Sequence, residues 1–192
     1  MQKWIGAAVI GIGVVAALGS AHLVSAQEAS KAEKQAAIRK EAQTTLTKLY
    51  SIHPGAKSTI QKAAGYAAFD NFGMNLFVLS TARGKGIAVA NKGKKETFMK
   101  MLSAGAGLGL GVKDFRVVFV FETPQALDNF MNSGWDADAQ AEATAKAGQK
   151  GGAYEGAISA SPGVWVYQLT EKGLALQATL QGTKYYKDDD LN

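Results

Sequence analysis

Four glycines stand at alternate positions from Gly105 to Gly111, inside the stretch SAGAGLGLGVKDFRVVFVF that spans residues 103–121. A dinucleotide-binding loop needs the spacing G-x-G-x-x-G and a helix that starts directly behind it. Here no glycine stands three positions after Gly107 or Gly109, a P-loop Lys-Ser/Thr pair is missing, and the residues that follow alternate as in a strand. The glycine pattern therefore predicts no phosphate-binding loop.

The period of two in this stretch indicates an extended strand instead. Successive side chains of a strand point to opposite faces, so the glycines leave one face bare while Ala, Leu and Val line the other. A bare face lets a helix or another sheet layer approach closely, and glycine permits sharp coiling. We therefore expect a strongly bent strand in a strongly curved sheet or partial β-barrel.

The first 26 residues are typical of a secretory signal peptide. A single charge at Lys3 precedes a long uncharged stretch, and Val24 and Ala26 are the small residues expected before a cleavage site. We predict cleavage near Ala26 and a periplasmic or secreted mature protein. The alternative is an inner-membrane anchor through residues 4–24, because ~18–20 apolar residues suffice to span a bilayer. The chain has no cysteine, so it offers no thiol for lipid attachment, disulfides, catalysis or metal binding.

Helical periodicity predicts three helices. Residues 28–50 carry a thin apolar stripe with charges elsewhere, which indicates a helix on the surface of the domain. A short second helix is expected after Pro54. The third helix covers 124–133, with Thr123 as its N-cap and Gly134 just past its end.

Short apolar runs broken by glycine and asparagine predict strands from residue 65 onward. Residues 136–147 fit two structures, because their alanine-rich composition favours a helix and their strict alternation favours a strand. The acidic end, 187–192, is expected to be a flexible tail. The elements together predict an α+β fold, with strands over 65–73, 74–82, 86–91, 96–102, 113–122, 152–160, 163–170 and 173–186 and turns at 71–73, 84–86 and 91–93.

The order of these motifs resembles the SYLF domain, a lipid-binding domain of bacteria and eukaryotes that also occurs in actin-regulating proteins. The segment AAGYAAFDNFG is similar to its opening alanine-glycine strand, and SAGAGLGLGVKDFRVVFVFETPQALDNF to its glycine strand, hydrophobic strand and helix. The segments GWDADAQAEATAKAGQKGG and VWVYQLTEKGLALQATLQGTKYY resemble its closing part. The segment KKETFMKML departs from the family's Trp-Ser-x-Pro-like pattern before the glycine strand.

The resemblance implies an antiparallel, barrel-like sheet with packed helices over residues 51–186, preceded by the separate helix of residues 27–50. It also implies a strand over 136–147 and binding to anionic lipids. Actin and phosphoinositides are not carried over, since an exported bacterial protein meets neither.

The sequence predicts that the protein is not an enzyme. His53, the one histidine after residue 26, precedes a proline in a turn and has no acidic residue nearby. Asp136, Asp138 and Glu142 would share one strand face and could bind a hard cation, but Lys146 continues that face, which favours a solvated polar surface. No G-x-S-x-G nucleophile elbow occurs. We therefore predict neither a catalytic residue nor a bound metal or cofactor.

Charge patterning carries the functional prediction. The segment between Asp70 and Glu96 holds no acidic residue, and its basic residues are Arg83, Lys85, Lys92, Lys94 and Lys95. Each basic residue near an anionic bilayer contributes roughly 1 kcal/mol of binding free energy. The strand expected between the two groups separates them by roughly 20 Å, so they need not face one membrane together. The alternative is a merely solvated basic surface.

These observations predict non-catalytic binding of a lipid or membrane surface in the bacterial cell envelope. Anionic phospholipids would contact the five basic residues, and Trp135 and Trp165 are expected as exposed aromatics at the membrane interface. The alternative function is a structural or protein-interaction module of an envelope complex, whose partner is unknown. The net charge of +5 permits nucleic-acid binding, but export and the absence of a helix-turn-helix or RNA-binding aromatic motif argue against a nucleic-acid partner.

Overall fold

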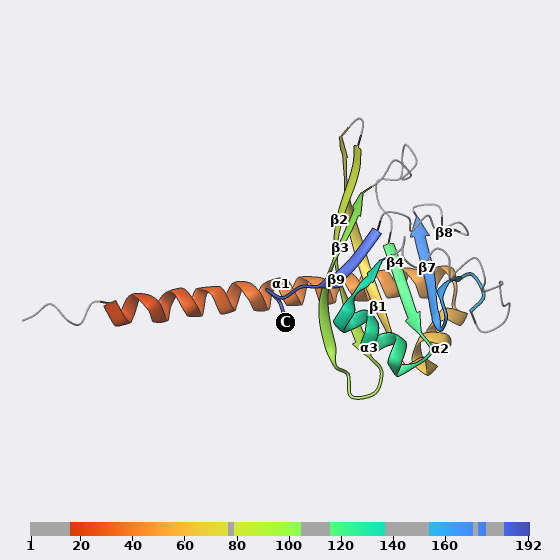
Figure 1. Ribbon diagram of the computed structural model, residues 1–192, viewed down its shortest axis with the longest axis horizontal. Helices are drawn as coiled ribbons and strands as arrows, with labels where there is room; N and C mark the ends of the chain where they lie inside the picture. Colours follow the sequence, from red (N-terminus) through yellow and green to blue (C-terminus); the bar gives the residue numbers. More distant parts are fainter. Residues whose placement is uncertain (1–15, 77–78, 105–115, 137–153, 171–172, 176–182) are drawn as a thin grey trace, which may run out of the picture.

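The computed structural model describes residues 16–76, 79–104, 116–136, 154–170, 173–175 and 183–192. Within these residues three helices accompany one antiparallel sheet (Figure 1). The helices are α1 (Ala16–Ile52), α2 (Gly55–Lys62) and α3 (Pro124–Ser133). The strands are β1 (Gly65–Leu76), β2 (Leu79–Ala90), β3 (Glu96–Ala104), β4 (Arg116–Phe121), β5 (Trp135–Asp136), β6 (Ile158–Ser161), β7 (Val164–Thr170), β8 (Gly173–Ala175) and β9 (Thr183–Lys187).

The sheet has the order β5-β9-β3-β2-β1-β4-β7-β6, and β8 pairs with β7. It is strongly curled, so that side chains of β4 and β9 meet across its inner face. This half-barrel confirms the predicted α+β class and the curved antiparallel sheet. The glycine strand expected over 105–111 lies outside the described residues, as does most of 136–147, so their predicted structures are not tested.

Strands β1 and β2 form one long hairpin, in register from the pair Gly65 and Ala90 to the pair Leu76 and Leu79. The turns predicted at 71–73 and 84–86 are wrong, because Asn71 and Gly84 pair with each other in the middle of this hairpin. Glycine serves close approach here: a Cβ on Gly86 would collide with the ring of Phe69 and the carbonyl of Ala68. The turn predicted at 91–93 is confirmed, with a left-handed backbone at residues 93 and 94.

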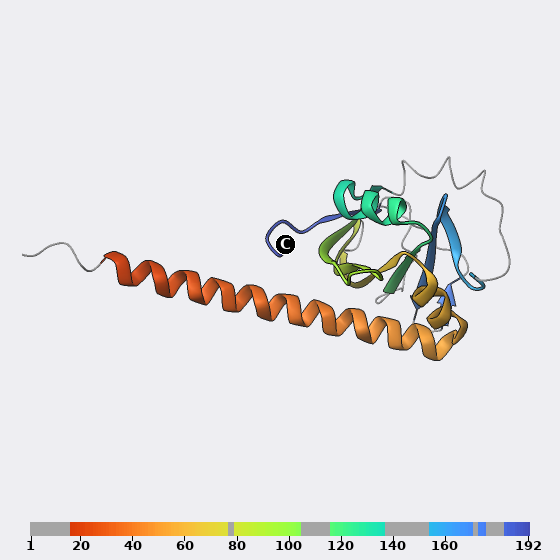
Figure 2. The same cartoon turned by 90° about the horizontal axis from the view of Figure 1, so that it is seen from below.

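The sheet buries one core on each face. Figure 2 shows α1 along one side of the sheet and α3 on the opposite side. The outer core lies under α1 and α2 and includes Ile38, Leu46, Leu49, Ile60, Ile87, Val118, Val120 and Tyr167. The inner core lies within the curl under α3 and includes Phe69, Met99, Phe119, Phe121, Leu127, Phe130, Met131 and Tyr185.

Helix α1 follows the predicted apolar stripe but is longer than expected. It begins at Ala16 and so continues through the predicted cleavage site, and its first half extends away from the sheet (Figure 1). Within the described part of the chain, no helix has both the length and the apolar character needed to cross a membrane. Cleavage near Ala26 stays a prediction.

Helix α3 has the ends that the sequence predicts. The hydroxyl of Thr123 accepts a hydrogen bond from the backbone N–H of Ala126 at 3.2 Å, Pro124 starts the helix, and Gly134 ends it at φ 75°. Leu127 packs against the sheet where Gly65 leaves room for it. Glycine is needed at this position because a Cβ would fill the space that Leu127 occupies.

The last strands are shorter than predicted, and the tail is folded. Residues 154–156 form a turn before β6, and the segment 173–186 contains two strands, β8 and β9, on either side of residues outside the description. The flexible tail expected over 187–192 is wrong, because Asp188 and Leu191 are buried. Its acidic sequence is typical of a solvated end, but Lys100 of β3 binds two of its carboxylates.

Candidate functional site

A groove lies between α1 and strands β2 and β3 on the outer face of the sheet. We call it the outer groove, and its volume is about 800 Å³. Side chains of β2 alternate between faces, so Arg83 and Lys85 share the outer face with Ile87, which packs into the core under α1. The groove is lined by Ala37, Ile38, Glu41, Asp70, Arg83, Gly84, Lys85, Lys100, Met101, Leu102 and Tyr186.

One wall of the outer groove is apolar and open to solvent. Leu102 of β3 and Tyr186 of β9 are 36% and 44% exposed, among the most exposed large hydrophobic side chains of the described residues. Ile38 of α1 lies across from this wall and is buried. Exposed apolar surface gathered at a groove, rather than scattered singly, is typical of a binding site.

The cations of the groove differ in their partners. Arg116 lies beside the groove, where its guanidinium contacts the carboxylates of Asp70 at 3.4 Å and Glu41 at 3.9 Å. Both groove acids are therefore paired with Arg116. Among the described residues, Arg83 and Lys85 have no ion pair and are exposed. These two side chains are the cations that a ligand can approach without displacing an acid.

A second cavity, which we call the lysine pocket, adjoins the outer groove and shares Lys85 and Lys100 with it. Its volume is about 400 Å³. The ammonium of Lys100 contacts Asp188 at 2.8 Å and Asp190 at 2.9 Å, and these hydrogen bonds raise the pKa of Lys100 well above its usual range. The hydrogen bond from Lys100 likewise lowers the pKa of Asp190. The pocket is lined by Ser30, Lys31, Lys34, Lys85, Lys100, Asp188, Asp190 and Leu191.

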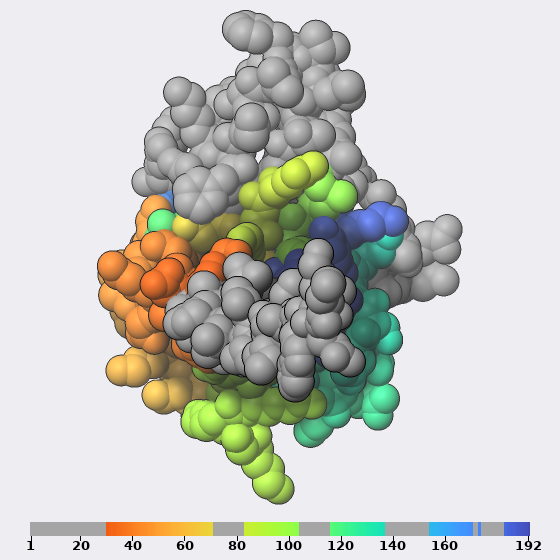
Figure 3. All heavy atoms as spheres, turned by 90° about the vertical axis from the view of Figure 1, so that its left-hand side faces the viewer, coloured from red at the N-terminus to blue at the C-terminus, as the bar shows by residue number. Residues whose placement is uncertain are grey.

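The structure separates the five predicted basic residues into two places. Arg83 and Lys85 line the outer groove. Lys92, Lys94 and Lys95 lie in the exposed β2–β3 turn at the other end of β2, which projects at the lower end of the sheet in Figures 1 and 3. The fold keeps the two groups apart. This agrees with the separation that the strand length between them predicts.

Lys100 is a groove cation that sequence reasoning missed. It follows Glu96, so it lies outside the acid-free segment. Alternation along β3 places Lys100 opposite Lys85 in the register of β2 and β3, on the same outer face. The alternating pattern of ETFMKML was the only signal that could have found it.

The two tryptophans are not exposed aromatics. Trp165 is 7% exposed, its indole donates to Glu122 Oε1 at 3.0 Å, and its ring stacks on Tyr154 at 4.6 Å. Trp135 is half-buried against Phe119, with ring centroids 5.5 Å apart. The expectation that Trp165 is exposed is wrong, because this side chain is part of the core.

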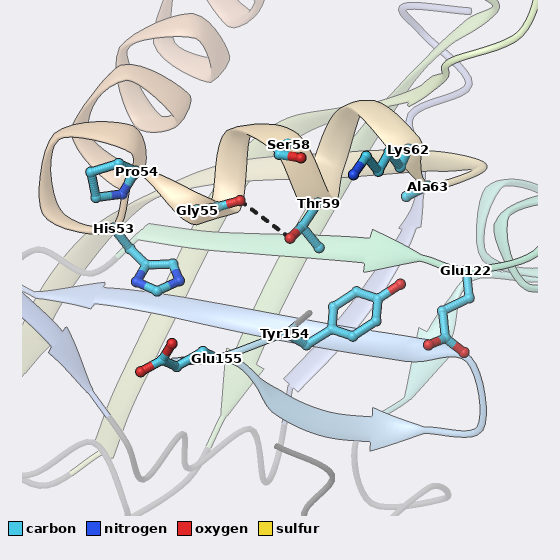
Figure 4. Close-up of a pocket in the computed structure, with 10 residues that line it drawn as sticks. All are labelled: His53, Pro54, Gly55, Ser58, Thr59, Lys62, Ala63, Glu122, Tyr154 and Glu155. Atoms are coloured by element: carbon cyan, nitrogen blue, oxygen red, sulfur yellow. Dashed lines mark hydrogen bonds between the residues drawn. The ribbon is translucent and has the colours of Figure 1, made fainter. Parts of the chain in front are cut away.

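A third cavity, the polar cleft, lies between α2 and the turn at residues 154–156 (Figure 4). It measures about 550 Å³ and holds His53, the turn histidine, at one end and Glu122 at the other. Its lining lacks the apolar wall of the outer groove.

Within the described residues, no cluster of three or more His, Asp or Glu side chains suits a metal ion. The outer groove is therefore the better candidate for an amphiphilic ligand.

The fold and the groove define the class of candidate: a curled antiparallel half-barrel with an amphipathic groove under its first helix. Residues 102–192 match the family model described as Ysc84, Las17-binding protein actin regulator. This part of the chain is a Ysc84/SYLF domain, which confirms the resemblance over these residues, whereas the similar segment at 63–73 lies outside the match. The match begins within β3 and includes β9 and the folded C-terminal segment.

A curated relative is similar along most of the chain. Beta cell expansion factor A of Aeromonas veronii is 39% identical over 161 residues, which cover 83% of this chain. The chain spans about 59% of the length of that relative. The chain is thus related to this bacterial factor and carries a Ysc84/SYLF domain over residues 102–192.

Proposed function

We propose that the protein binds anionic lipids without catalysis, in the bacterial cell envelope, and that the outer groove holds the lipid. One observation carries the proposal: the groove combines an exposed apolar wall, Leu102 and Tyr186, with two cations, Arg83 and Lys85, that form no ion pair with any other described residue. A ligand that suits both features has a hydrocarbon part and an anionic group at one end. SYLF domains are lipid-binding in general, which supports the proposal.

The chemistry of the groove suits an amphiphile better than a small polar solute. Apolar surface removed from water contributes about 25 cal/mol per Å², so an acyl chain against Leu102 and Tyr186 gains free energy that a polar molecule does not. Each lysine or arginine near an anionic surface adds about 1 kcal/mol. The two contributions act together only where both features meet, as they do in this groove.

Lys92, Lys94 and Lys95 have a separate role in this proposal. At ~3.3 Å per residue, the seven steps from Lys85 to Lys92 measure roughly 23 Å, too far for one headgroup to contact both. The turn lysines therefore contact the surrounding membrane surface, while the groove binds one lipid. Export after cleavage near Ala26 places the protein at the periplasmic surface, and N-terminal mass determination of the purified protein tests the cleavage.

Co-sedimentation with vesicles tests the groove. The protein, purified as the cell produces it, is mixed with phosphatidylcholine vesicles or with vesicles that also contain phosphatidylglycerol, at low and at ~0.15 M salt, where the Debye length is about 8 Å. We expect binding to the anionic vesicles only. The groove variant Arg83→Gln/Lys85→Gln should lose most of this binding.

The control variant is Lys40→Gln/Lys57→Gln, which removes the same charge from exposed positions of α1 and α2 outside the groove. It should keep most of the binding. Equal losses in both variants would show that net charge, not the groove, attracts the membrane, and would overturn the groove. Loss only in Lys92→Gln/Lys94→Gln/Lys95→Gln would move the contact to the turn. No binding by the wild-type protein would move the function to a protein partner.

A further inference from the structure

We propose that the acidic C-terminal segment, residues 188–192, regulates the outer groove by competing with the ligand's anionic group for Lys100. This inference rests on the proposed lipid binding and adds a regulation to it. In the structure the Asp190 carboxylate forms an ion pair with the ammonium of Lys100. A bound anionic group would replace the Asp190 carboxylate in this pair. The segment is thus a ligand mimic that belongs to the same chain.

The lysine pocket is positive even with the segment in place. Four lysines, Lys31, Lys34, Lys85 and Lys100, surround two carboxylates, those of Asp188 and Asp190. Lys85 and Lys100 also line the outer groove, so an anionic group held by Lys85 lies beside Lys100. Lys100 would be the second cation to contact this anionic group, but it is already paired with carboxylates of the C-terminal segment.

The two carboxylates on Lys100 differ in how easily they can leave. The side chain of Asp188 is 2% exposed, and its backbone N–H donates to the carbonyl of Phe98 at 2.9 Å. The side chain of Asp190 is 86% exposed. An exposed ion pair gains little because water and salt screen it, whereas a buried carboxylate that loses its partner is costly. Asp190 is therefore the replaceable partner and Asp188 the permanent one.

Contacts on both sides hold the segment while Asp190 is displaced. The Lys31 ammonium donates to the carbonyl of Asn192 at 3.0 Å, and the Gln35 amide donates to the carbonyl of Leu191 at 2.7 Å. The Asn192 side chain donates to Phe98 on β3 at 2.8 Å. Because these contacts do not involve the Asp190 side chain, its carboxylate can turn into solvent without release of the backbone.

Asp189 provides a matched control for the test. It is exposed and, among the described residues, makes no ion pair. Asp189→Asn and Asp190→Asn remove the same charge from adjacent positions, so both change the overall field of the protein equally. Only Asp190→Asn removes a carboxylate from Lys100, which keeps its ion pair with Asp188. Thermal unfolding of each variant checks that both fold like the wild-type protein.

The affinities of the two variants for phosphatidylglycerol-containing vesicles are measured at ~0.15 M salt. We expect Asp190→Asn to bind about two- to fivefold more tightly than Asp189→Asn, the range that loss of an exposed competing pair allows. In a Lys100→Gln background the difference between the two variants should disappear. A difference that persists in this background would overturn the competition at Lys100.

A second arm uses inorganic phosphate, which has the anionic chemistry without the lipid. Tighter phosphate binding by Asp190→Asn, without tighter vesicle binding, would support the competition for Lys100. The competing anionic group would then come from a soluble phosphate and not from a lipid. Equal binding by Asp190→Asn and Asp189→Asn to both probes would overturn the competition, while vesicle binding by the wild-type protein would leave the proposed function intact. If no variant binds either probe, both proposals fail.

Discussion

The rings of Phe119 and Tyr185 meet edge to face with centroids 4.8 Å apart, although three strands separate β4 from β9 in the sheet. In a flat sheet, four steps of ~4.8 Å would place these strands roughly 19 Å apart. The contact therefore measures how strongly the sheet curls. It also shows that the inner face closes on its own aromatic side chains, so the ligand-accessible groove lies on the outer face.

Replacement of Tyr185 tests this closure. Tyr185→Ala should destabilise the protein by about 3–5 kcal/mol, because it empties the centre of the inner core. Among the described residues the Tyr185 hydroxyl is buried without a hydrogen-bond partner, so Tyr185→Phe should change the free energy of unfolding by less than about 1 kcal/mol. Urea unfolding of both variants measures these changes in the free energy of unfolding. A large loss of stability in Tyr185→Phe would show that the hydroxyl has a hydrogen-bond partner.

Alkaline pH should destabilise the fold through its buried tyrosines. Burial raises the pKa of Tyr167 to about 12 and that of Tyr185 further, from an ordinary value of 10.0. Between pH 10 and 12 these tyrosines lose their protons in the unfolded chain and keep them in the folded protein, so stability is full below pH 10 and falls as the pH rises. Thermal melts across this range, with the phenolate absorbance, measure the effect. Tyr185→Phe should reduce the fall, and an unchanged fall would contradict the assignment to Tyr185.

Gly86 should resist any side chain. Gly86→Ala brings a methyl group against the Phe69 ring and the Ala68 carbonyl, and we expect a loss of about 1–3 kcal/mol in the free energy of unfolding. The control is Gly93→Asn in the β2–β3 turn, where φ is 79° and nothing lies within 4 Å. Asparagine tolerates this conformation, so chemical unfolding should show a smaller loss. Equal losses would contradict the close approach at Gly86.

Glu122 should stabilise the aromatic pair at the edge of the polar cleft. Its carboxylate accepts the indole hydrogen bond of Trp165, and Tyr154 stacks on that indole. Glu122→Ala should cost about 1 kcal/mol of stability, since the buried indole N–H loses its acceptor. Glu155→Ala removes an exposed carboxylate from the same cleft and should change the melting temperature little. A loss as large in Glu155→Ala would place the stabilising charge elsewhere.

Local chemistry was sufficient for the elements whose signals are local. Thr123 and Gly134 delimit α3 because a hydroxyl cap and a left-handed glycine act within one turn of helix. The stripe of α1 and the alternating run of β7 follow from periodicity alone. The basic segment and the family resemblance were also visible in the sequence, since both depend on residue order rather than on distant contacts.

Tertiary structure decided what depends on residues far apart in the chain. Glycine marks both turns and close approaches, so only the pairing of Asn71 with Gly84 shows that one long hairpin runs through the predicted turns. The tail is folded because Lys100, some ninety positions earlier, binds its carboxylates. The outer groove exists only where α1 crosses a sheet whose curl has already buried the other face. The packing of α1 and the curl of the sheet cannot be predicted from composition, because both arise from contacts between segments that are far apart in the sequence.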